Sequence, residues 1–317
     1  MAALSPLTGA APPPMPPARL VATLVANPKN PILGDALVED ARRAAGDGTE
    51  RDVLARGIAA DLLVAGPAEP AALEARLREA LRGAPVDVIV QPAASRRKGL
   101  VLADMDSTMI GQECIDELAD YVGLKAEVAA ITERAMRGEI AFEPALRERV
   151  ALLRDLPVGV VDEIIGRRLT LTPGGRELVA AMRARGGYAC LVSGGFTLFT
   201  GPVAARLGFD EHRANRLVVA GGRLAGTVEE PVLGREAKRA ALVELRERRG
   251  LRREDTIAVG DGANDLAMLG EAGLGVAFRA KPAVAAAAGA RVEHADLTAL
   301  LYAQGYRDSE IAAYSLA

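Results

Sequence analysis

Short apolar runs alternate with amphipathic stretches in the first third of the chain. Four runs predict strands and two intervening stretches predict helices; in chain order these are strand 20–26, helix 32–45, strands 52–56 and 58–64, helix 70–82 and strand 86–90. This β-α-β-β-α-β order is typical of a ferredoxin-like α+β sandwich, here spanning residues 19–92. Residues 1–18 are crowded with Pro and Ala and are expected to be a disordered tail.

From residue 99 onward the apolar runs lack alternation, which is typical of strands buried on both faces of a parallel sheet. The predicted strands are 100–103, 188–192, 256–259 and 275–278, and the predicted helices between them are 175–185, 236–249 and 264–272. We therefore expect an α/β core over residues 99–300. Residues 112–170 are too long for a loop and predict an inserted helical cap.

Smaller segments complete the expected organisation. Residues 217–219 and 224–228 flank Gly221-Gly222 and predict a hairpin, and 283–290 predict a plain helix. Residues 301–317 form a C-terminal tail or helix. The polar stretch 91–98 is typical of a linker, and we expect Arg96, Arg97 and Lys98 to be its solvated charges.

Composition excludes several classes of function. The net charge of −3 argues against a strongly basic nucleic-acid binder, and aromatic residues make up only 3%, which disfavours a base-stacking surface. Two cysteines, Cys114 and Cys190, and two histidines cannot build a disulfide framework, a Cys-rich zinc site or a multi-histidine metal site. Any metal must therefore be held by oxygen, which favours Mg²⁺. No apolar run reaches the ~18 residues of a membrane span and no signal peptide is evident, so we expect a cytoplasmic protein.

Polar residues follow three of the predicted core strands, where ligands of an open α/β sheet bind. They are Asp104 and Asp106 after the first, Ser193 and Gly194 after the second, and Asp261, Asn264 and Asp265 after the third; Lys238 lies early in the helix before that third strand. Four crowded carboxylates would repel one another unless a divalent cation neutralises them. Such a cation and a substrate phosphate favour phosphoryl chemistry, with one carboxylate as nucleophile and another holding a proton.

Each motif alone also has a plain structural explanation. Asp at a strand end or before Gly is common in turns, Asn264 or Asp265 could cap a helix, and Lys238 could be a surface lysine. These explanations compete poorly with function because the motifs follow the expected strands in order.

Together these motifs resemble those of the haloacid-dehalogenase-like phosphohydrolases, and within them the phosphoserine phosphatases. The resemblance covers about residues 99–300, with Met105 where Phe is usual, and rests on the following segments: Asp104 to Thr108 with Glu113, Met136-Arg137-Gly138 to Phe142, Leu146 to Val150, Val192 to Phe196, Asn215-Arg216-Leu217, Glu236-Ala237-Lys238, Val259 to Asp265 and Ala280-Lys281-Pro282.

The resemblance implies a fold, a mechanism and a set of roles. The fold would be a Rossmann-like core with a helical cap, and the reaction would be Mg²⁺-dependent hydrolysis of phosphoserine, the last step of serine biosynthesis. Asp104 would be the nucleophile that forms an aspartyl phosphate, and Asp106 the proton donor and base. The other implied roles are phosphate contacts from Ser193, Gly194, Lys238 and Asn264, and metal contacts from Asp104, the Asp106 carbonyl, Asp261 and Asp265.

The cap would recognise the amino-acid part of the substrate. Glu113 would meet the amino group, Arg149 the carboxylate, and Met136 and Phe142 would form an apolar wall. From the residues alone, an exposed ion pair and core packing remain open for these four. Other readings of the whole chain are a phosphatase for another small phosphomonoester, such as phosphohomoserine, and a non-catalytic amino-acid-sensing module. The N-terminal region resembles ACT-type modules in element order only. A homodimer formed through this region remains an open alternative.

Overall fold

The computed structural model describes residues 20–66, 68–136 and 139–315. The predicted tail 1–18 lies outside these residues. The first part of the chain forms a four-stranded sheet in the order β2-β3-β1-β4, and all of its strand pairs are antiparallel. Its elements are β1 (Leu20–Ala26), α1 (Asp35–Ala45), β2 (Glu50–Ala55), β3 (Ala59–Val64), α2 (Pro70–Ala80) and β4 (Val86–Pro92). This order and pairing confirm the ferredoxin-like prediction.

A six-stranded parallel sheet forms the centre of the molecule, in the order β12-β11-β10-β5-β6-β7. Its strands are β5 (Leu100–Ala103), β6 (Tyr188–Phe196), β7 (Glu211–Asn215), β10 (Thr256–Gly260), β11 (Leu274–Phe278) and β12 (Ala290–Val292). The four predicted strands are confirmed, whereas β7 and β12 were not predicted. The predicted helix 283–290 is wrong at its end, because the helix stops at Ala287 and Ala290 already pairs with β11.

Alternate residues of the central strands pack on opposite faces of this sheet. In β5, Val101 and Ala103 belong to one apolar cluster, and Leu100 and Leu102 belong to another. Both faces are therefore buried, which explains why the central strand sequences are mostly apolar and do not alternate. The surrounding helices are α7 (Gly175–Ala184), α8 (Thr197–Leu207), α9 (Arg235–Arg248), α10 (Leu266–Glu271), α11 (Pro282–Ala287), α12 (Ala299–Ala303) and α13 (Asp308–Ser315).

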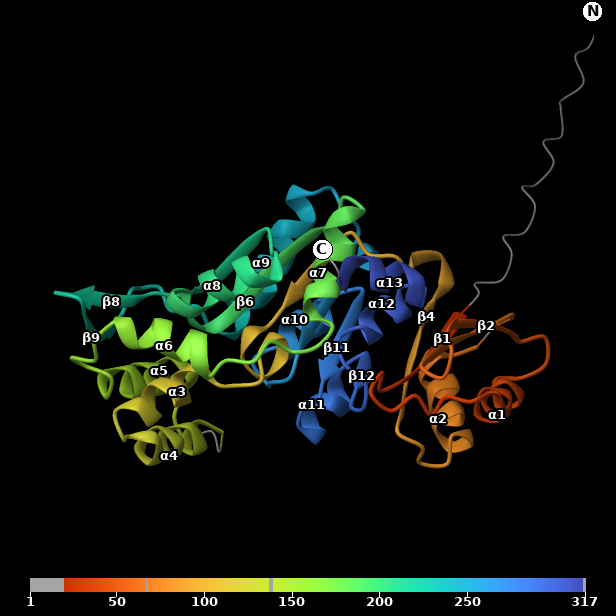
Figure 1. The fold of residues 1–317 in the computed structure, drawn as a ribbon, viewed down its shortest axis with the longest axis horizontal. Coiled ribbons are helices and arrows are strands. Elements are labelled where there is room, and N and C mark those ends of the chain that lie inside the picture. The colour runs from red at the N-terminus through yellow and green to blue at the C-terminus, as the bar shows by residue number, and fades with distance from the viewer. Residues whose placement is uncertain (1–19, 67, 137–138, 316–317) are drawn as a thin grey trace, which may run out of the picture.

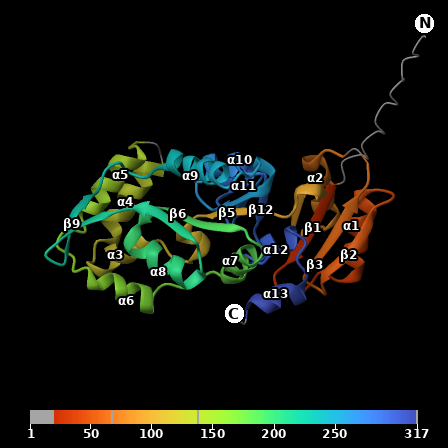
Figure 2. The same ribbon diagram turned by 90° about the horizontal axis from the view of Figure 1, so that it is seen from above.

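Among the described residues, four α-helices form the insertion between β5 and α7, as expected for a cap. They are α3 (Cys114–Tyr121), α4 (Lys125–Met136), α5 (Phe142–Ala151) and α6 (Gly159–Arg167). The hairpin of β8 (Leu217–Ala220) and β9 (Arg223–Val228) lies against them, since Leu224 exchanges backbone hydrogen bonds with Asp155 and Leu156. Figures 1 and 2 show the cap and the N-terminal sheet at opposite ends of the central sheet. None of the described helices combines the length and apolar character that crossing a membrane requires.

The prediction that residues 96–98 are merely solvated linker charge is wrong for two of the three. The Arg96 guanidinium lies 2.7 Å from the buried carboxylate of Asp61, and Lys98 Nζ donates to the carbonyl oxygens of Ser95 and Glu254. These partners come from both parts of the chain, so the cations join them. Only Arg97 is exposed, and its guanidinium stacks 3.8 Å from the centre of the Tyr306 ring.

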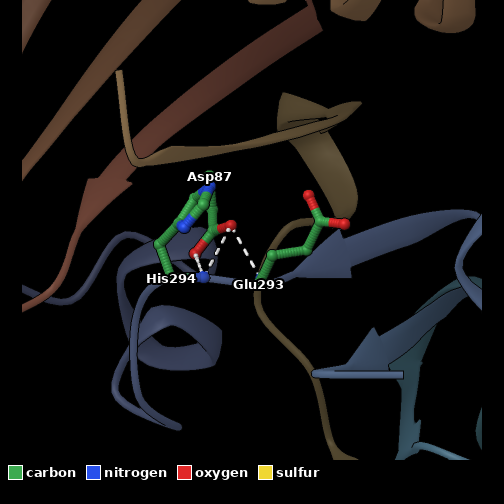
Figure 3. Close-up of side chains that lie close together, drawn as sticks. All are labelled: Asp87, Glu293 and His294. Atoms are coloured by element: carbon green, nitrogen blue, oxygen red, sulfur yellow. Dashed lines mark hydrogen bonds between the residues drawn. The ribbon is translucent and has the colours of Figure 1, made fainter. Parts of the chain in front are cut away.

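A buried carboxylate on β4 makes a second connection between the two parts (Figure 3). The Asp87 oxygens accept hydrogen bonds from the backbone N–H groups of Glu293, His294 and Ala295, at 2.8 to 3.3 Å. Asp87, Glu293 and His294 lie close enough to suggest a metal site. Because both Asp87 oxygens already bind backbone donors, we assign this cluster to holding the N-terminal sheet against the segment after β12.

Candidate active site

Acidic side chains from two neighbouring strands of the central sheet meet around one lysine. Asp104 follows β5, Asp261 and Asp265 follow β10, and a carboxylate oxygen of each lies within 4.8 Å of the others. Lys238 Nζ, contributed by α9, lies 2.7 Å from Asp104 Oδ1 and 2.7 Å from Asp265 Oδ1. The structure thus brings the predicted residues of three separate segments to the carboxyl edge of the sheet.

The charges in this cluster are almost completely removed from water. The side chains of Lys238, Asp104 and Asp265 are 1%, 7% and 0% exposed. Burial alone would lower the pKa of Lys238, but the carboxylates of Asp104 and Asp265 raise it above its usual value. Burial raises the pKa of Asp104, and the charge of Asp265 adds to this effect. Burial also raises the pKa of Asp261 to about 6.

This donor set fits a divalent cation. Three carboxylates with a single lysine leave excess negative charge, and hard oxygen donors are what such a cation prefers. A cation would also relieve the repulsion that raises the carboxylate pKa values. The sheet edge therefore offers a set of oxygen donors that could hold a divalent cation.

The turn after β5 holds the first motif in place. Asp104 Oδ1 accepts a 2.8 Å hydrogen bond from the Met105 N–H, and Thr108 Oγ1 donates to Asp261 Oδ1 at 3.0 Å. Ser107 adopts a left-handed conformation with φ of 54°, an uncommon one for a residue with a side chain. Its hydroxyl donates to Glu113 Oε1 at 2.7 Å. The turn therefore connects the nucleophile candidate to the metal-site and cap candidates.

Asp106 lies on the other side of this turn, close to the second motif. Its Oδ1 accepts a hydrogen bond from the Cys114 N–H, and its Oδ2 would lie 3.0 Å from a Cβ at Gly195. The missing side chain at Gly195 therefore permits this approach. Burial, followed by the negative charge of Glu113, raises the pKa of Asp106 to about 7. A carboxyl group with that pKa can both donate and accept a proton near neutral pH.

The second motif is buried at the end of β6. Ser193 is 0% exposed, and its Oγ accepts a 2.8 Å hydrogen bond from the Gly195 N–H. The ring of Phe142 covers Gly194, because a Cβ there would lie 3.2 Å from the ring. Phe142 also lines a cavity of about 370 Å³ at the seam between cap and core, with the residues Ala141, Glu143, Pro144, Val232, Gly234, Arg235, Glu236 and Ala237.

The remaining predicted residues lie at the rim of the site or on the cap. Glu113 lies near the start of α3 and contacts Ser107, as described above. Arg149, on α5, donates to the carbonyl of Ala145 and to Thr132 Oγ1 at 3.2 and 3.3 Å. Burial lowers the pKa of Arg149, while the charges of Asp116 and Glu113 raise it. Asn264 lies against Gly262, and the side chain of Met136 lies outside the described residues.

Comparison with known proteins identifies the family. The model of the haloacid dehalogenase-like hydrolases matches residues 101–270. The chain belongs to this family. A phosphoserine phosphatase from Methanocaldococcus jannaschii is 43% identical over 65% of this chain and 97% of its own length. One from Archaeoglobus fulgidus is 42% identical over 68% of this chain, and that match spans only 63% of the relative.

Solved structures extend the similarity of this haloacid dehalogenase-like hydrolase. A substrate-bound phosphoserine phosphatase complex is 43% identical, with a TM-score of 0.60, over 65% of this chain and 98% of the other. An unliganded probable phosphoserine phosphatase from Vibrio cholerae is 32% identical, with a TM-score of 0.74, over 94% of this chain and 88% of the other. The second similarity therefore includes most of the N-terminal sheet.

Sequence reasoning gave no role to one buried polar residue beside the second motif. Asn215, at the end of β7, is 3% exposed and hydrogen-bonds the backbone at Gly194 and Leu233. Its only sequence signal was the resemblance of Asn215-Arg216-Leu217 to a family segment. Nothing in that segment indicated which groups the side chain would contact.

Proposed function

We propose that the chain is a Mg²⁺-dependent phosphatase that hydrolyses O-phosphoserine to serine and phosphate through an aspartyl phosphate on Asp104. The observation that carries this proposal is the meeting of Asp104, Asp261 and Asp265 around Lys238 at the sheet edge. The relatives named phosphoserine phosphatase support the choice of substrate.

The first step is a displacement at phosphorus. Asp104 Oδ1 carries the hydrogen bonds from Met105 and Lys238, so Oδ2 is the oxygen without these bonds and is our candidate to attack. The new bond joins Asp104 to phosphorus as the bond to the serine oxygen breaks. Asp106 supplies the proton that this departing oxygen takes up, for which its raised pKa suits it.

The second step regenerates the enzyme. Asp106, now ionised, takes a proton from a water molecule as that water attacks phosphorus. The bond between phosphorus and Asp104 breaks, and phosphate leaves with the water oxygen. One carboxyl group thus serves as acid and then as base, which splits a difficult hydrolysis into two easier steps.

Charge on the phosphoryl group needs neutralisation in both steps. Lys238, the Ser193 hydroxyl, the Gly194 N–H and Asn264 are our candidates for this. Asp104, the Asp106 carbonyl and Asp261 would hold Mg²⁺, with Asp265 supporting from behind, since it also accepts from Lys238 and the Gly262 N–H. When bound, Mg²⁺ would supply positive charge that stabilises the phosphoryl oxygens.

The cap residues would select the amino acid. In this proposal Glu113 binds the substrate ammonium, Arg149 binds its carboxylate, and Phe142 with Met136 excludes water. Arg149 is part-buried and hydrogen-bonds its own helix at Ala145 and the neighbouring helix α4 at Thr132, so it is already held in place without substrate. Prepositioning of this kind lowers the entropy lost on binding.

Phosphate release tests the proposal directly. Purified chain with Mg²⁺ should hydrolyse phosphoserine, and Asp104→Asn should abolish turnover. Arg149→Ala should raise KM for phosphoserine by at least tenfold and spare p-nitrophenyl phosphate, which has no carboxylate. Arg134→Ala, on the exposed face of α4, is the matched control. A panel of phosphate esters that includes phosphohomoserine tests the substrate. A higher kcat/KM for another ester would change the substrate assignment, and no turnover of any ester would reject the proposal that the chain is a phosphatase.

A further inference from the structure

Asn215 connects two of the segments that carry phosphate-contact candidates. Its Nδ2 donates to the Gly194 carbonyl at 2.9 Å and to the Leu233 carbonyl at 3.2 Å. Its Oδ1 accepts from the Leu233 N–H at 2.6 Å. Asn215 is 3% exposed, so its amide group makes its hydrogen bonds with the backbone at Gly194 and Leu233.

Asn215 and the Ser193 hydroxyl are hydrogen-bonded to the two ends of the same peptide unit. The carbonyl that accepts from Asn215 belongs to the peptide between Gly194 and Gly195. The N–H of that same peptide donates to Ser193 Oγ at 2.8 Å. Accepting a bond at the oxygen polarises a peptide and strengthens its N–H as a donor. Because Oγ is occupied as an acceptor on this side, the Ser193 proton is left to point elsewhere.

The bonds to Leu233 fix the other side of the same arrangement. Leu233 precedes Gly234, the residue before the first turn of α9, and that first turn carries Lys238. Glycines at 194, 195 and 234 give this region few side chains of its own to hold the backbone. The hydrogen bonds of Asn215 therefore restrain the backbone at both Gly194 and Leu233.

We propose that Asn215 is a positioning residue that directs the Ser193 hydroxyl toward the phosphoryl group through the Gly194–Gly195 peptide. The inference rests on the proposed phosphatase function for its kinetic consequences. Asn215 touches no reacting atom in this scheme. It affects catalysis by orienting Ser193, and its bonds to Leu233 also fix the position of the start of α9.

A double-mutant cycle tests the path. Asn215→Asp keeps the shape and the acceptor for the Leu233 N–H but loses both donors. In the wild-type background it should lower kcat for phosphoserine about 10- to 100-fold, somewhat less than the loss of a complete oxyanion donor. In a Ser193→Ala background the same change should cost less than about fivefold, because the group it directs is gone. Equal costs in the two backgrounds would overturn the proposal.

The preference between two substrates distinguishes a positioning role from general damage to the fold, because general damage would change that preference. Asn215 is bonded to the phosphate-side backbone and not to the amino-acid candidates Glu113 and Arg149. The ratio of kcat/KM for phosphoserine to that for p-nitrophenyl phosphate should therefore stay within about twofold of wild type. A change of tenfold or more in this ratio would indicate a displaced cap and contradict the assignment.

Asn27 offers a matched control. It is also a partly buried asparagine that bonds backbone groups, donating to the His294 carbonyl and accepting from the Lys29 N–H, far from the catalytic edge. Asn27→Asp should leave kcat within twofold of wild type. If Asn215→Asp fails to fold by circular dichroism, Asn215→Ser replaces it, because Ser also removes the amide donor while leaving space for water.

Binding of inorganic phosphate separates this inference from the proposed function. Calorimetric titration in the presence of Mg²⁺ should show at least tenfold weaker phosphate binding for Asn215→Asp and for Ser193→Ala, and no further loss in the double variant. This result would support positioning even if wild type turned over no ester, an outcome that would reject only the phosphatase proposal. Unchanged phosphate affinity in Asn215→Asp would reject the positioning role.

Discussion

Replacing Lys238 by methionine should destabilise the protein in the absence of metal. The ammonium group lies 2.7 Å from each of two carboxylates, and all three side chains are buried. Removing one partner of a buried ion pair typically costs 3–5 kcal/mol, because it leaves an uncompensated buried charge. For a chain of this size, about 2 °C per kcal/mol converts this to a fall of roughly 6–10 °C in the unfolding midpoint.

Thermal unfolding with and without Mg²⁺ measures the effect. In EDTA, the midpoint of Lys238→Met should lie 6–10 °C below that of wild type, whereas Lys29→Met, at an exposed position, should shift it by less than about 1 °C. Adding Mg²⁺ should raise the midpoint of Lys238→Met more than that of wild type, because the cation meets one more uncompensated negative charge. Phosphatase activity should fall at least about 100-fold, since we propose that Lys238 also neutralises charge on the phosphoryl group.

An unchanged or higher midpoint of Lys238→Met in EDTA would refute this reasoning. It would mean that the cost of burying the ammonium group equals or exceeds its attraction to Asp104 and Asp265. A variant that is destabilised but whose midpoint rises no more with Mg²⁺ than that of wild type would contradict the assignment of the carboxylates as the groups that hold the cation.

Three further predictions concern pH and the connection between the two parts of the chain. Asp106 has its pKa raised to about 7 by burial, so kcat/KM for phosphoserine should fall about tenfold per unit above pH 7, and Asp106→Asn should lack this limb; a level wild-type profile from pH 7 to 9 would exclude the role. Burial lowers the pKa of Lys98 from 10.5 to about 8, so the unfolded chain binds more protons between these values. Wild type should therefore gain stability relative to Lys98→Met as the pH rises from 8 to 10, and a constant difference in urea midpoints would contradict this. Asp87→Ala leaves the buried N–H of Ala295 and the less buried N–H groups of Glu293 and His294 without their acceptor, and it should cost roughly 1–3 kcal/mol in urea unfolding. A cost no larger than that of the exposed Asp47→Ala would contradict the structural role.

The extent to which the fold was predictable depended on where each strand lies in its sheet. The four central strands of the core are buried on both faces and are mostly apolar, so their sequences identified them within a few residues. Strand β7 lies at the sheet edge and has the sequence Glu-His-Arg-Ala-Asn, in which no apolar run appears. Strand β12, at the other edge, has three residues. Short edge strands carry little of the burial signal on which pattern analysis relies.

The linker cations show a second limit of sequence reasoning. Arg96 and Lys98 occur in a polar, irregular segment, and such charges are usually solvated. Their partners are Asp61 on β3 and the carbonyl of Glu254, which lie 35 residues before and 156 residues after them in the chain. Whether a charge is buried depends here on how the two sheets meet. Local composition contains no information on that contact.

The contrast between local sequence and long-range contacts also explains which residues of the candidate active site were predictable. Most of the metal and phosphate candidates, such as Asp104, Ser193 and Asp261, lie at or just after the ends of strands of one parallel sheet, and the topology of such a sheet brings its carboxyl ends together whatever the details of packing. Asn215 acts through backbone groups of Gly194 and Leu233, which are present in every residue and leave no mark in a sequence. Its role follows only from coordinates that show which carbonyl accepts its amide. Residues of this kind deserve mutation alongside the carboxylates, because a donor that is present but misdirected contributes little to the transition state.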